Sequence, residues 1–174
     1  PSTTSHLVTT RAIVFTAPGQ VEVQDMDMPA PGAGEVQIET RYSSISSGTE
    51  GWVLHNQFTW APTTYPVVPG YQRVGTITAL GAGVSGWKEG DVVMATNSSW
   101  ATSPVPFWGS HASLANTKAE NVYSLPEGAN PVDAAATVVV QVGYNAAYRP
   151  YLEPGDWVVV YGDGPIGQFG AQAA

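Results

Sequence analysis

The sequence predicts a mostly β fold, a small barrel or curled sheet with short helices, followed by the first strand and helix of an α/β unit. Short segments of alternating apolar and polar residues, separated by turn residues, fill the first 125 residues. Glycine (19 residues) and proline (14 residues) are frequent, which favours many turns over a helical bundle. Towards the end of the sequence a nearly uniform apolar run enters a glycine-rich loop, which is typical of a parallel α/β sheet.

The strands of the first part follow one another at short intervals. Residues 11–27 alternate on either side of Pro18-Gly19, as the two strands of a hairpin do. Further strands are expected over residues 34–46, 73–84 and 90–96, with two short ones within residues 109–128. Strands of this length and spacing favour a small barrel or curled sheet.

Two helical segments interrupt or follow these strands. Residues 47–58 predict a short helix, with Ser47 or Thr49 as its N-cap and Glu50 in its first turn. A second helical region starts at Asn130, where an N-cap residue is followed by proline and, after one more residue, by aspartate. Alanines favour this helix, whereas a run of three valines and Gly143 favour a break or a restart within it.

A glycine-rich loop follows the apolar segment Asp156–Tyr161, which predicts a strand buried on both faces of a sheet. The G-x-G-x-x-G pattern between a strand and a helix start is typical of a loop that binds the pyrophosphate of a dinucleotide. Backbone N–H groups at the start of the helix attract the phosphates. The alternative is an ordinary tight turn. We expect the cofactor-binding residues to be Gly162, Gly164, Pro165, Ile166 and Gly167.

The composition excludes several classes of function. The formal net charge is −8 and there are six Lys and Arg residues, too few to neutralise many phosphates, so no nucleic-acid partner is expected. The chain has no cysteine, and therefore no disulfide, thiolate nucleophile or cysteine-ligated zinc. The first ten residues do not have the pattern of a signal peptide, and no apolar run has membrane-spanning length. We expect a cytoplasmic protein that does not associate with membranes.

Four segments together resemble the medium-chain dehydrogenase/reductase superfamily of zinc-type alcohol dehydrogenases and quinone reductases. They are "GAGVSGWKEGDVVMA", "GSHASLANTKAENVYSLPEG", the alanine-rich segment ending in "GYNAAYRP", and "LEPGDWVVVYGDGPIGQFGAQAA". The resemblance implies a GroES-like catalytic domain, then a Rossmann domain, with hydride transfer to or from NAD or NADP in the cleft between them. The residue that selects NAD or NADP lies about 20 residues beyond the loop, so the sequence leaves that preference open.

The resemblance also implies a domain layout. Residues 1–10 are expected to be a flexible tail, residues 11–150 the GroES-like domain with connecting helices, and residues 151–174 the incomplete start of the Rossmann domain. Members of the superfamily are about twice as long, and many dimerise through the Rossmann sheet. We therefore expect this chain to be the N-terminal part of a longer, homodimeric parent and to be inactive alone.

The resemblance places the zinc-binding positions of the superfamily on residues that suit zinc poorly. A Cys-Gly-Thr-Asp stretch is replaced by Ser47-Gly48-Thr49-Glu50, the histidine of a Gly-His-Glu stretch by Tyr71, and the third ligand by Val138 or a neighbour. Residues 97–109 replace the four-cysteine structural zinc lobe. We expect a member without metal. A metal bound through unusual donors remains the alternative, and the candidate donors are Glu50, His55 and His111.

Without zinc, other groups must polarise the substrate. The resemblance places Thr49 at the hydroxyl position that relays protons in zinc-dependent members, and Tyr71 at a position that points to the substrate. We predict these two as catalytic residues. The alternatives are a helix N-cap for Thr49 and a packing role for Tyr71.

The substrate is expected to be a small apolar or aromatic carbonyl compound, enone or quinone, because aromatic residues are frequent in the segments that border the cleft by resemblance. These residues are Trp52, Phe58, Trp60, Tyr65, Tyr71, Trp100, Phe107 and Trp108. The predicted function is that of an NAD(P)-dependent, zinc-independent oxidoreductase. The alternatives are a non-catalytic binding protein on a dehydrogenase scaffold and a metal-dependent alcohol dehydrogenase with unusual ligands.

Overall fold

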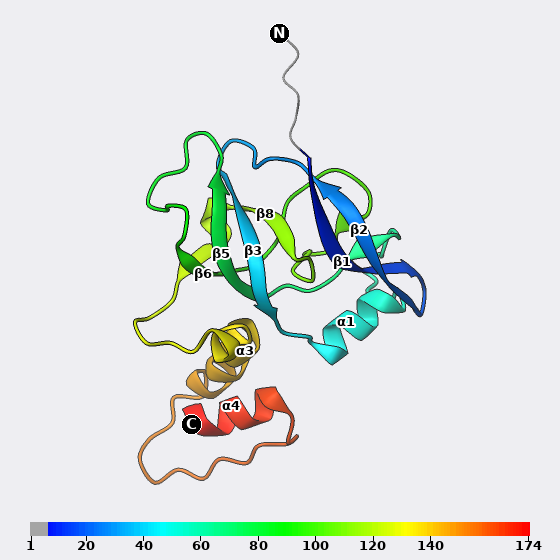
Figure 1. The fold of residues 1–174 in the computed structure, drawn as a ribbon. Helices are drawn as coiled ribbons and strands as arrows, with labels where there is room; N and C mark the ends of the chain where they lie inside the picture. The colour runs from blue at the N-terminus through cyan, green and yellow to red at the C-terminus, as the bar shows by residue number, and fades with distance from the viewer. Residues whose placement is uncertain (1–6) are drawn as a thin grey trace. The chain divides into compact units, whose positions relative to one another are not determined.

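The computed structural model describes residues 7–174 of the chain. These residues divide into two compact units, one that ends at Ala135 and one that spans Ala136–Ala174. The first unit consists mainly of strands and the second contains two helices (Figure 1). The mostly β fold class is confirmed. The division between the compact units falls between Ala135 and Ala136. The domain boundary expected between residues 150 and 151 concerns function, and it stays a prediction.

Two sheets build the first unit, with strand orders β2-β1-β4-β7 and β8-β3-β5-β6-β9. Nearly all neighbouring strands are antiparallel, and the short pair β4 and β7 is parallel. The strands are β1 (Val8–Ala17), β2 (Gln20–Met28), β3 (Glu35–Ser43), β4 (Val67–Val68), β5 (Arg73–Leu80), β6 (Val92–Ala95), β7 (Val105–Pro106), β8 (Leu114–Lys118) and β9 (Val122–Ser124). A short 3-10 helix, η1 (Ala119–Asn121), precedes β9.

The first hairpin forms as predicted, with Pro18-Gly19 between β1 and β2. The strand β1 begins at Val8, however, so the expectation of a flexible tail over residues 1–10 is wrong for its last residues. Thr10 is buried, and its hydroxyl donates a hydrogen bond to the Leu114 carbonyl at 2.9 Å, which fixes this end of the strand. Residues 1–6 of the expected tail lie outside the described residues.

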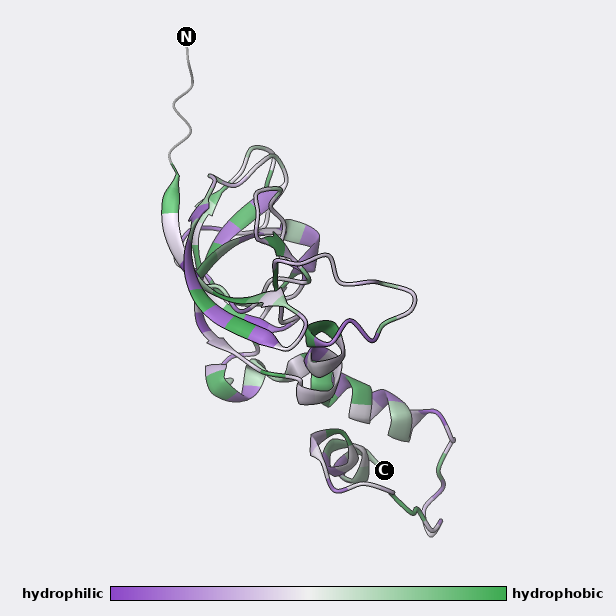
Figure 2. Ribbon diagram, turned by 90° about the vertical axis from the view of Figure 1, so that its right-hand side faces the viewer, coloured by the Kyte–Doolittle hydropathy of each residue, from purple (hydrophilic) through white to green (hydrophobic). Residues whose placement is uncertain are grey.

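Apolar side chains of the two sheets fill the core, and hydrophobic and hydrophilic residues alternate along the long strands (Figure 2). Val14, Met28 and Val68 of the first sheet pack with Ala115 of β8 in the second sheet. A second cluster belongs to β3, β5, β6 and β9 and includes Ile38. Because burial of such side chains stabilises the fold by roughly 1.5–3 kcal/mol each, this core holds the surrounding loops in place.

The helix α1 (Ser47–Leu54) lies at the end of β3 (Figure 1). Its N-cap is Ser46, so the predicted caps Ser47 and Thr49 are wrong. The N–H of Ser46 donates instead to the Glu50 carboxylate at 2.9 Å. A side chain one turn into the helix therefore satisfies the backbone group at its start.

The helical region after Asn130 breaks earlier than expected. Asn130 caps α2 (Pro131–Ala134) as predicted, since its side-chain oxygen accepts the Val132 N–H at 3.0 Å. The break falls at Ala135 and Ala136, and α3 (Thr137–Tyr148) continues unbroken through Gly143. A Cβ at Gly143 would come within 2.8 Å of the Ile166 carbonyl, so the glycine permits close packing against the next helix.

The last helix, α4 (Pro165–Ala173), forms as predicted, with Gly164 as its N-cap and Pro165 in its first turn. The strand expected at Asp156–Tyr161 does not form. No described residue pairs with this segment, and Trp157 and Tyr161 are 98% and 94% exposed. The prediction of a buried strand is therefore wrong for this structure, because a strand is held by its neighbours and the segment has none among the described residues.

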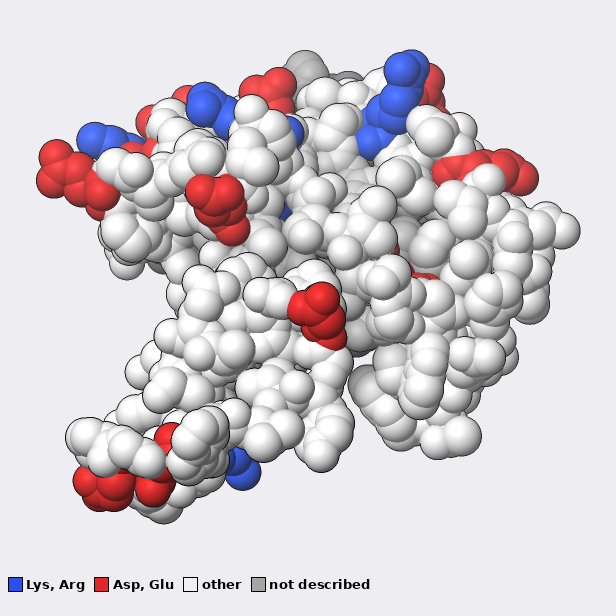
Figure 3. Space-filling view, turned by 90° about the horizontal axis from the view of Figure 1, so that it is seen from below, with Lys and Arg blue, Asp and Glu red and all other residues white. Residues whose placement is uncertain are grey.

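Charged side chains are scattered on the face shown in Figure 3, where Lys and Arg form no patch. Among residues 7–174, no helix has both the length and the apolar character that crossing a membrane requires.

Candidate active site

Three polar side chains from distant parts of the sequence form a hydrogen-bonded line in the first unit. The Nε2 atom of His111 lies 2.8 Å from a carboxylate oxygen of Glu50 in α1. The Nδ1 atom of the same ring lies 2.8 Å from the hydroxyl of Ser43 at the end of β3. Glu50 and His111 are only 5% and 6% exposed, so the contact between them is shielded from water.

Each polar atom of this buried pair has a partner. One oxygen of Glu50 accepts the Ser46 N–H, and the other faces His111. A carboxylate and an imidazole can be buried at tolerable cost only when they are paired and hydrogen-bonded in this way. The sequence predicts Glu50 and His111 at most as donors to a metal with unusual ligands, and Glu50 also as a residue of the first helical turn. Their contact spans 61 residues of sequence, and no local pattern signals it.

The loop that carries His111 is fixed by backbone hydrogen bonds and by a glycine. The N–H of His111 donates to the Pro69 carbonyl at 3.1 Å, and its carbonyl accepts the Ile13 N–H at 2.9 Å. Gly70 adopts φ = +89°, and a Cβ there would lie 2.7 Å from the imidazole. The ring can occupy its place only because residue 70 has no side chain.

The two predicted catalytic residues, Thr49 and Tyr71, are both half-buried in the first unit. Thr49 lies in the first turn of α1, directly before Glu50. Tyr71 directly follows Gly70, and its ring meets Trp108 edge to face with centroids 5.5 Å apart. Thr49 is therefore the sequence neighbour of Glu50 and Tyr71 that of Gly70, and no hydrogen bond joins the two predicted residues in the described part of the chain.

Four of the aromatic residues named from the sequence pack against one apolar cluster formed by Phe15, Val53 and Val67, and two chains of ring contacts extend from it. These four are Phe58, Tyr65, Phe107 and Trp108. Trp52, Phe58 and Trp60 form a chain of ring contacts with centroids 5.3 and 5.0 Å apart, and both tryptophans are exposed. Phe107 packs on Trp108 at 4.8 Å, which extends the group around Tyr71. Trp100 packs against the core between the sheets and donates to the Pro104 carbonyl, so it does not join the other aromatic residues as expected.

Arg73 is fully buried near the same loop. Its guanidinium donates to the carbonyls of Gly109 and Ala115 and to the hydroxyl of Thr117. Burial lowers the pKa of Arg73 to about 9, which still leaves it protonated at neutral pH. It ties β5 to β8 and to the loop that leads into His111, and it holds a positive charge without a carboxylate partner among the described residues.

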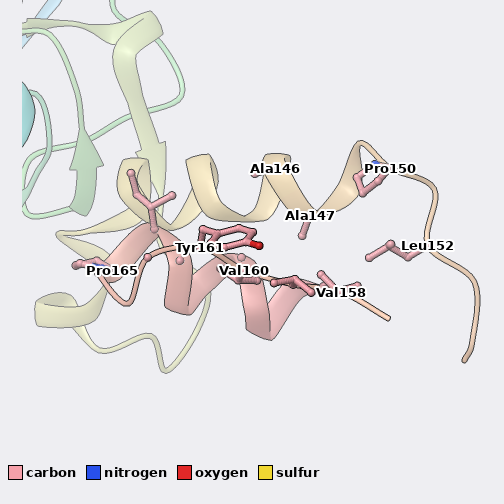
Figure 4. A pocket seen from close by; sticks show the side chains of 15 residues that line it. Ala146, Ala147, Pro150, Leu152, Val158, Val160, Tyr161 and Pro165 are labelled. Atoms are coloured by element: carbon pink, nitrogen blue, oxygen red, sulfur yellow. The ribbon is translucent and has the colours of Figure 1, made fainter. Parts of the chain in front are cut away.

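The glycine loop of the second unit has the geometry of a tight turn into a helix. Gly162 adopts φ = +104°, and a Cβ at Gly167 would lie 2.0 Å from the Gly162 carbonyl. At Gly164 the position of a Cβ is open space. An apolar cavity of about 630 Å³ adjoins the loop (Figure 4). Ala147, Val158, Val160 and Pro165 are among its lining residues.

Comparison with known proteins identifies the family. Residues 32–127 match the alcohol dehydrogenase GroES-like domain. The chain belongs to this alcohol dehydrogenase family. Its relatives include an alcohol dehydrogenase of Moraxella sp. strain TAE123, which is 29% identical over 185 residues, with 94% of this chain and 54% of the relative covered. This chain thus spans about half the length of the curated relatives that it matches.

Solved structures of alcohol dehydrogenases share the fold. The thermostable enzyme from Pyrobaculum aerophilum has a TM-score of 0.81 and 25% identity, with 95% of this chain and 55% of that chain covered. An Escherichia coli CFT073 alcohol dehydrogenase in complex with NADH has a TM-score of 0.78 and 23% identity, with 92% and 51% covered. The family assignment confirms the resemblance to medium-chain dehydrogenases.

The residues that the family resemblance places at zinc-binding positions are poor zinc ligands. Ser47 and Tyr71 offer neutral oxygens, and Val138 offers an alkyl group. Glu50 and His111 direct their polar atoms at each other and at Ser43 and Ser46. Among the described residues, no three His, Asp or Glu side chains come together as a metal site.

The glycine loop does fit a dinucleotide. The open space at Gly164 lets a pyrophosphate approach the backbone, and the start of α4 presents N–H groups that suit an anion. The close approach at Gly167 matches the role of the last glycine in the motif, which is to pack the helix against the turn.

Proposed function

We propose that this chain forms the catalytic domain and the first nucleotide-binding unit of an NAD(P)-dependent oxidoreductase that works without zinc. The observation that carries the proposal is the close turn from Gly162 to Gly167 at the start of α4, in a chain of the alcohol dehydrogenase family. Residues 11–150 would serve the substrate and residues 151–174 the cofactor. The bound NADH of the E. coli relative supports a nicotinamide dinucleotide, with NAD and NADP both open.

The residues Gly162, Gly164, Pro165, Ile166 and Gly167 would hold the pyrophosphate through backbone groups. When bound, the nicotinamide supplies the hydride-transfer chemistry, and the protein supplies orientation and hydrogen bonds.

The substrate proposed for this enzyme is a carbonyl compound, enone or quinone with an apolar or aromatic body. The exposed rings of Trp52 and Trp60 beside Phe58 support this class, since planar groups pack well on aromatic faces. The phenol of Tyr71 or the hydroxyl of Thr49 would donate a hydrogen bond to the substrate oxygen, in place of the zinc of other family members.

A non-catalytic binding protein is the second candidate. The replacement of the zinc-binding residues by Ser47, Tyr71 and Val138 supports it as well, because loss of the metal is also compatible with loss of the chemistry.

An assay with purified protein separates the two. Because the chain spans about half the length of its relatives, the assay uses the longest natural polypeptide that contains it, which we call the parent polypeptide. NADH and NADPH are each mixed with a panel of enones, quinones and aldehydes, before and after treatment with a chelator. If the protein is a zinc-independent oxidoreductase, at least one combination of cofactor and substrate should be turned over, at a rate that the chelator does not change. Cofactor binding without any turnover would favour the binding protein, and loss of turnover on chelation would favour a metal with unusual ligands.

A further inference from the structure

We propose that Ser43, His111 and Glu50 form a proton relay between two pockets of the first unit, and that this relay supplies the proton that accompanies reduction of the substrate. The inference rests on the proposed oxidoreductase function. It adds three residues from β3, α1 and the loop before β8 to the residues predicted from the sequence.

The three side chains form a continuous path. The hydroxyl of Ser43 is 2.8 Å from Nδ1 of His111, and Nε2 of the same ring is 2.8 Å from the Glu50 carboxylate. Both distances are short enough for direct proton transfer. The carboxylate orients the imidazole, as the third member does in a hydroxyl–imidazole–carboxylate triad.

The two ends of the path open into different pockets. Ser43 and His111 line a pocket of about 310 Å³ that is mostly apolar but also includes the exposed residues Arg11 and Arg41, through which water can reach Ser43. Glu50 and His111 line a second pocket of about 290 Å³, which is otherwise mostly apolar and includes Phe15 and Leu54.

Both pockets are mostly apolar, so we assign them by their charged groups: the pocket with two exposed arginines to solvent and the pocket with the Glu50 carboxylate to the carbonyl-type substrate. Neither Thr49 nor Tyr71 lines the pocket at Glu50, so in this proposal Glu50 is the group that reaches the substrate oxygen.

The hydrogen bonds allow a proton to pass along the line. In the neutral state, Nε2–H donates to Glu50 and the Ser43 hydroxyl donates to Nδ1. Water gives a proton to Ser43 as Ser43 gives its own to Nδ1, Nε2 passes its proton to Glu50, and Glu50 passes it to the substrate oxygen. One O–H bond forms on the product and one breaks in water, leaving hydroxide in the solvent-side pocket. No relay residue is oxidised or reduced. After the product leaves, water that enters the pocket at Glu50 returns a proton through Glu50 to Nε2, while Nδ1 returns its proton through Ser43 to the hydroxide, so the imidazole regains its first tautomer.

A structural ion pair is the competing explanation, and it predicts different behaviour. Burying a charged pair is weak evidence for stability, because apolar residues of similar volume often serve as well. The charged group in contact with His111 is Glu50 from α1. Arg11, which pairs with Asp25, and Arg41 line the pocket beside the ring. A merely structural pair needs no hydroxyl at Ser43, whereas a relay fails without it.

Exchange of the His111 Nε2 proton with water tests the relay without any catalysis. It is measured by NMR on the parent polypeptide with 15N-labelled histidine, and the resonance is assigned with a His111→Asn variant. The relay predicts that Ser43→Ala and Glu50→Gln each slow this exchange by about tenfold or more, because the proton can leave Nε2 only as another arrives at Nδ1. Ser43→Thr keeps the hydroxyl and should exchange at the wild-type rate. If the pair is only structural, both variants weaken it and exchange is unchanged or faster, which overturns the relay.

Turnover of the same variants tests the catalytic role. Glu50→Gln keeps a hydrogen bond but cannot carry the proton, so kcat should fall about 10- to 100-fold and the solvent deuterium isotope effect should rise. Ser43→Ala should show the same fall in kcat and the same rise in the isotope effect, and Ser43→Thr should restore both to the wild-type values. Wild-type rates and isotope effects in both defective variants would overturn this role. A wild-type parent that transfers no hydride would refute the proposed function instead, and the exchange measurement would still decide the relay.

Discussion

The imidazole of His111 lies against the backbone of Gly70, so closely that a Cβ on residue 70 would be 2.7 Å from two of its ring atoms. This contact holds the ring between Ser43 and Glu50. One glycine in the loop between β4 and β5 thus sets the position of the line of side chains on which the proposed proton transfer depends.

Gly70→Ala should therefore destabilise the protein for two reasons, the clash with His111 and the positive φ. Gly83 offers a matched control, because it has φ = +79° but open space at the Cβ position. We expect Gly83→Ala to lower the free energy of unfolding by about 1 kcal/mol and Gly70→Ala to lower it by about 3 kcal/mol or more. Urea denaturation of both variants measures the difference. Equal losses would show that the imidazole does not press on Gly70.

Arg73 is the donor to three buried acceptors, so its removal should destabilise the fold. Arg73→Met has a similar volume and removes the charge, but it leaves the carbonyls of Gly109 and Ala115 and the hydroxyl of Thr117 without this donor. We therefore expect the free energy of unfolding at neutral pH to fall by about 3 kcal/mol or more. Thr117→Val removes the hydroxyl partner alone and should lower it by about 1–3 kcal/mol. Denaturant unfolding of the two variants gives the comparison. An Arg73→Met variant as stable as the wild type would contradict this expectation.

The same residue predicts a pH dependence. Burial lowers the pKa of Arg73 from its ordinary value to about 9, so the folded state releases this proton at lower pH than the unfolded chain does. Between those values the unfolded chain binds more protons, and the contribution of Arg73 to the free energy of unfolding rises with pH. Unfolding curves between pH 8 and the highest pH that the protein tolerates (about 11) should show a slope that Arg73→Met lacks. The same pH slope in the wild type and in Arg73→Met would refute a contribution from Arg73.

Replacement of the second and third glycines of the nucleotide loop, Gly164 and Gly167, should affect different properties. At Gly167 a Cβ would lie 2.0 Å from a carbonyl oxygen, so Gly167→Ala should disrupt the turn and lower stability. At Gly164 the space is open and φ is −79°, so Gly164→Ala should fold normally. We expect it nonetheless to weaken NADH or NADPH binding about tenfold or more, because the methyl group occupies the approach of the pyrophosphate. Fluorescence titration of the parent polypeptide measures the affinity, and full affinity in Gly164→Ala would argue against a pyrophosphate at that glycine.

Tyr71→Phe removes only the phenol hydroxyl and keeps the ring contact with Trp108. If the hydroxyl polarises the substrate, kcat of the parent polypeptide should fall about 10- to 1,000-fold, with little change in stability. Tyr42→Phe on the exposed side of β3 is the control and should leave kcat unchanged. Steady-state kinetics measures kcat of both variants. A wild-type kcat in Tyr71→Phe would show that Tyr71 serves only in packing.

Local patterns predicted those parts of the fold that local forces fix. The Pro18-Gly19 hairpin, the cap at Asn130 and the start of α4 at Pro165 each depend on residues a few positions apart. The strand expected at Asp156–Tyr161 failed for the opposite reason, because an apolar sequence becomes a strand only when neighbouring strands pair with it.

The site was less predictable than the fold. Thr49 and Tyr71 were found through family resemblance, and their roles remain predictions. The contact between Glu50 and His111 could not be predicted, because it joins residues 61 positions apart and depends on the course of the loop over Gly70. The contact and the conformation of Gly70 that permits it are properties of the folded chain, and neither is visible in the sequence.

Transfer of deuterium from cofactor to product tests the central claim most directly. The parent polypeptide is stripped of metal, its zinc content is measured, and it is supplied with NADH or NADPH carrying deuterium at the reactive carbon and with an enone, quinone or aldehyde. The account predicts deuterium bound to carbon in the alcohol or saturated ketone formed from an aldehyde or enone, at an unchanged rate and with far less than one zinc per chain. Transfer that occurs only after zinc is restored, or cofactor binding without any transfer, would contradict it.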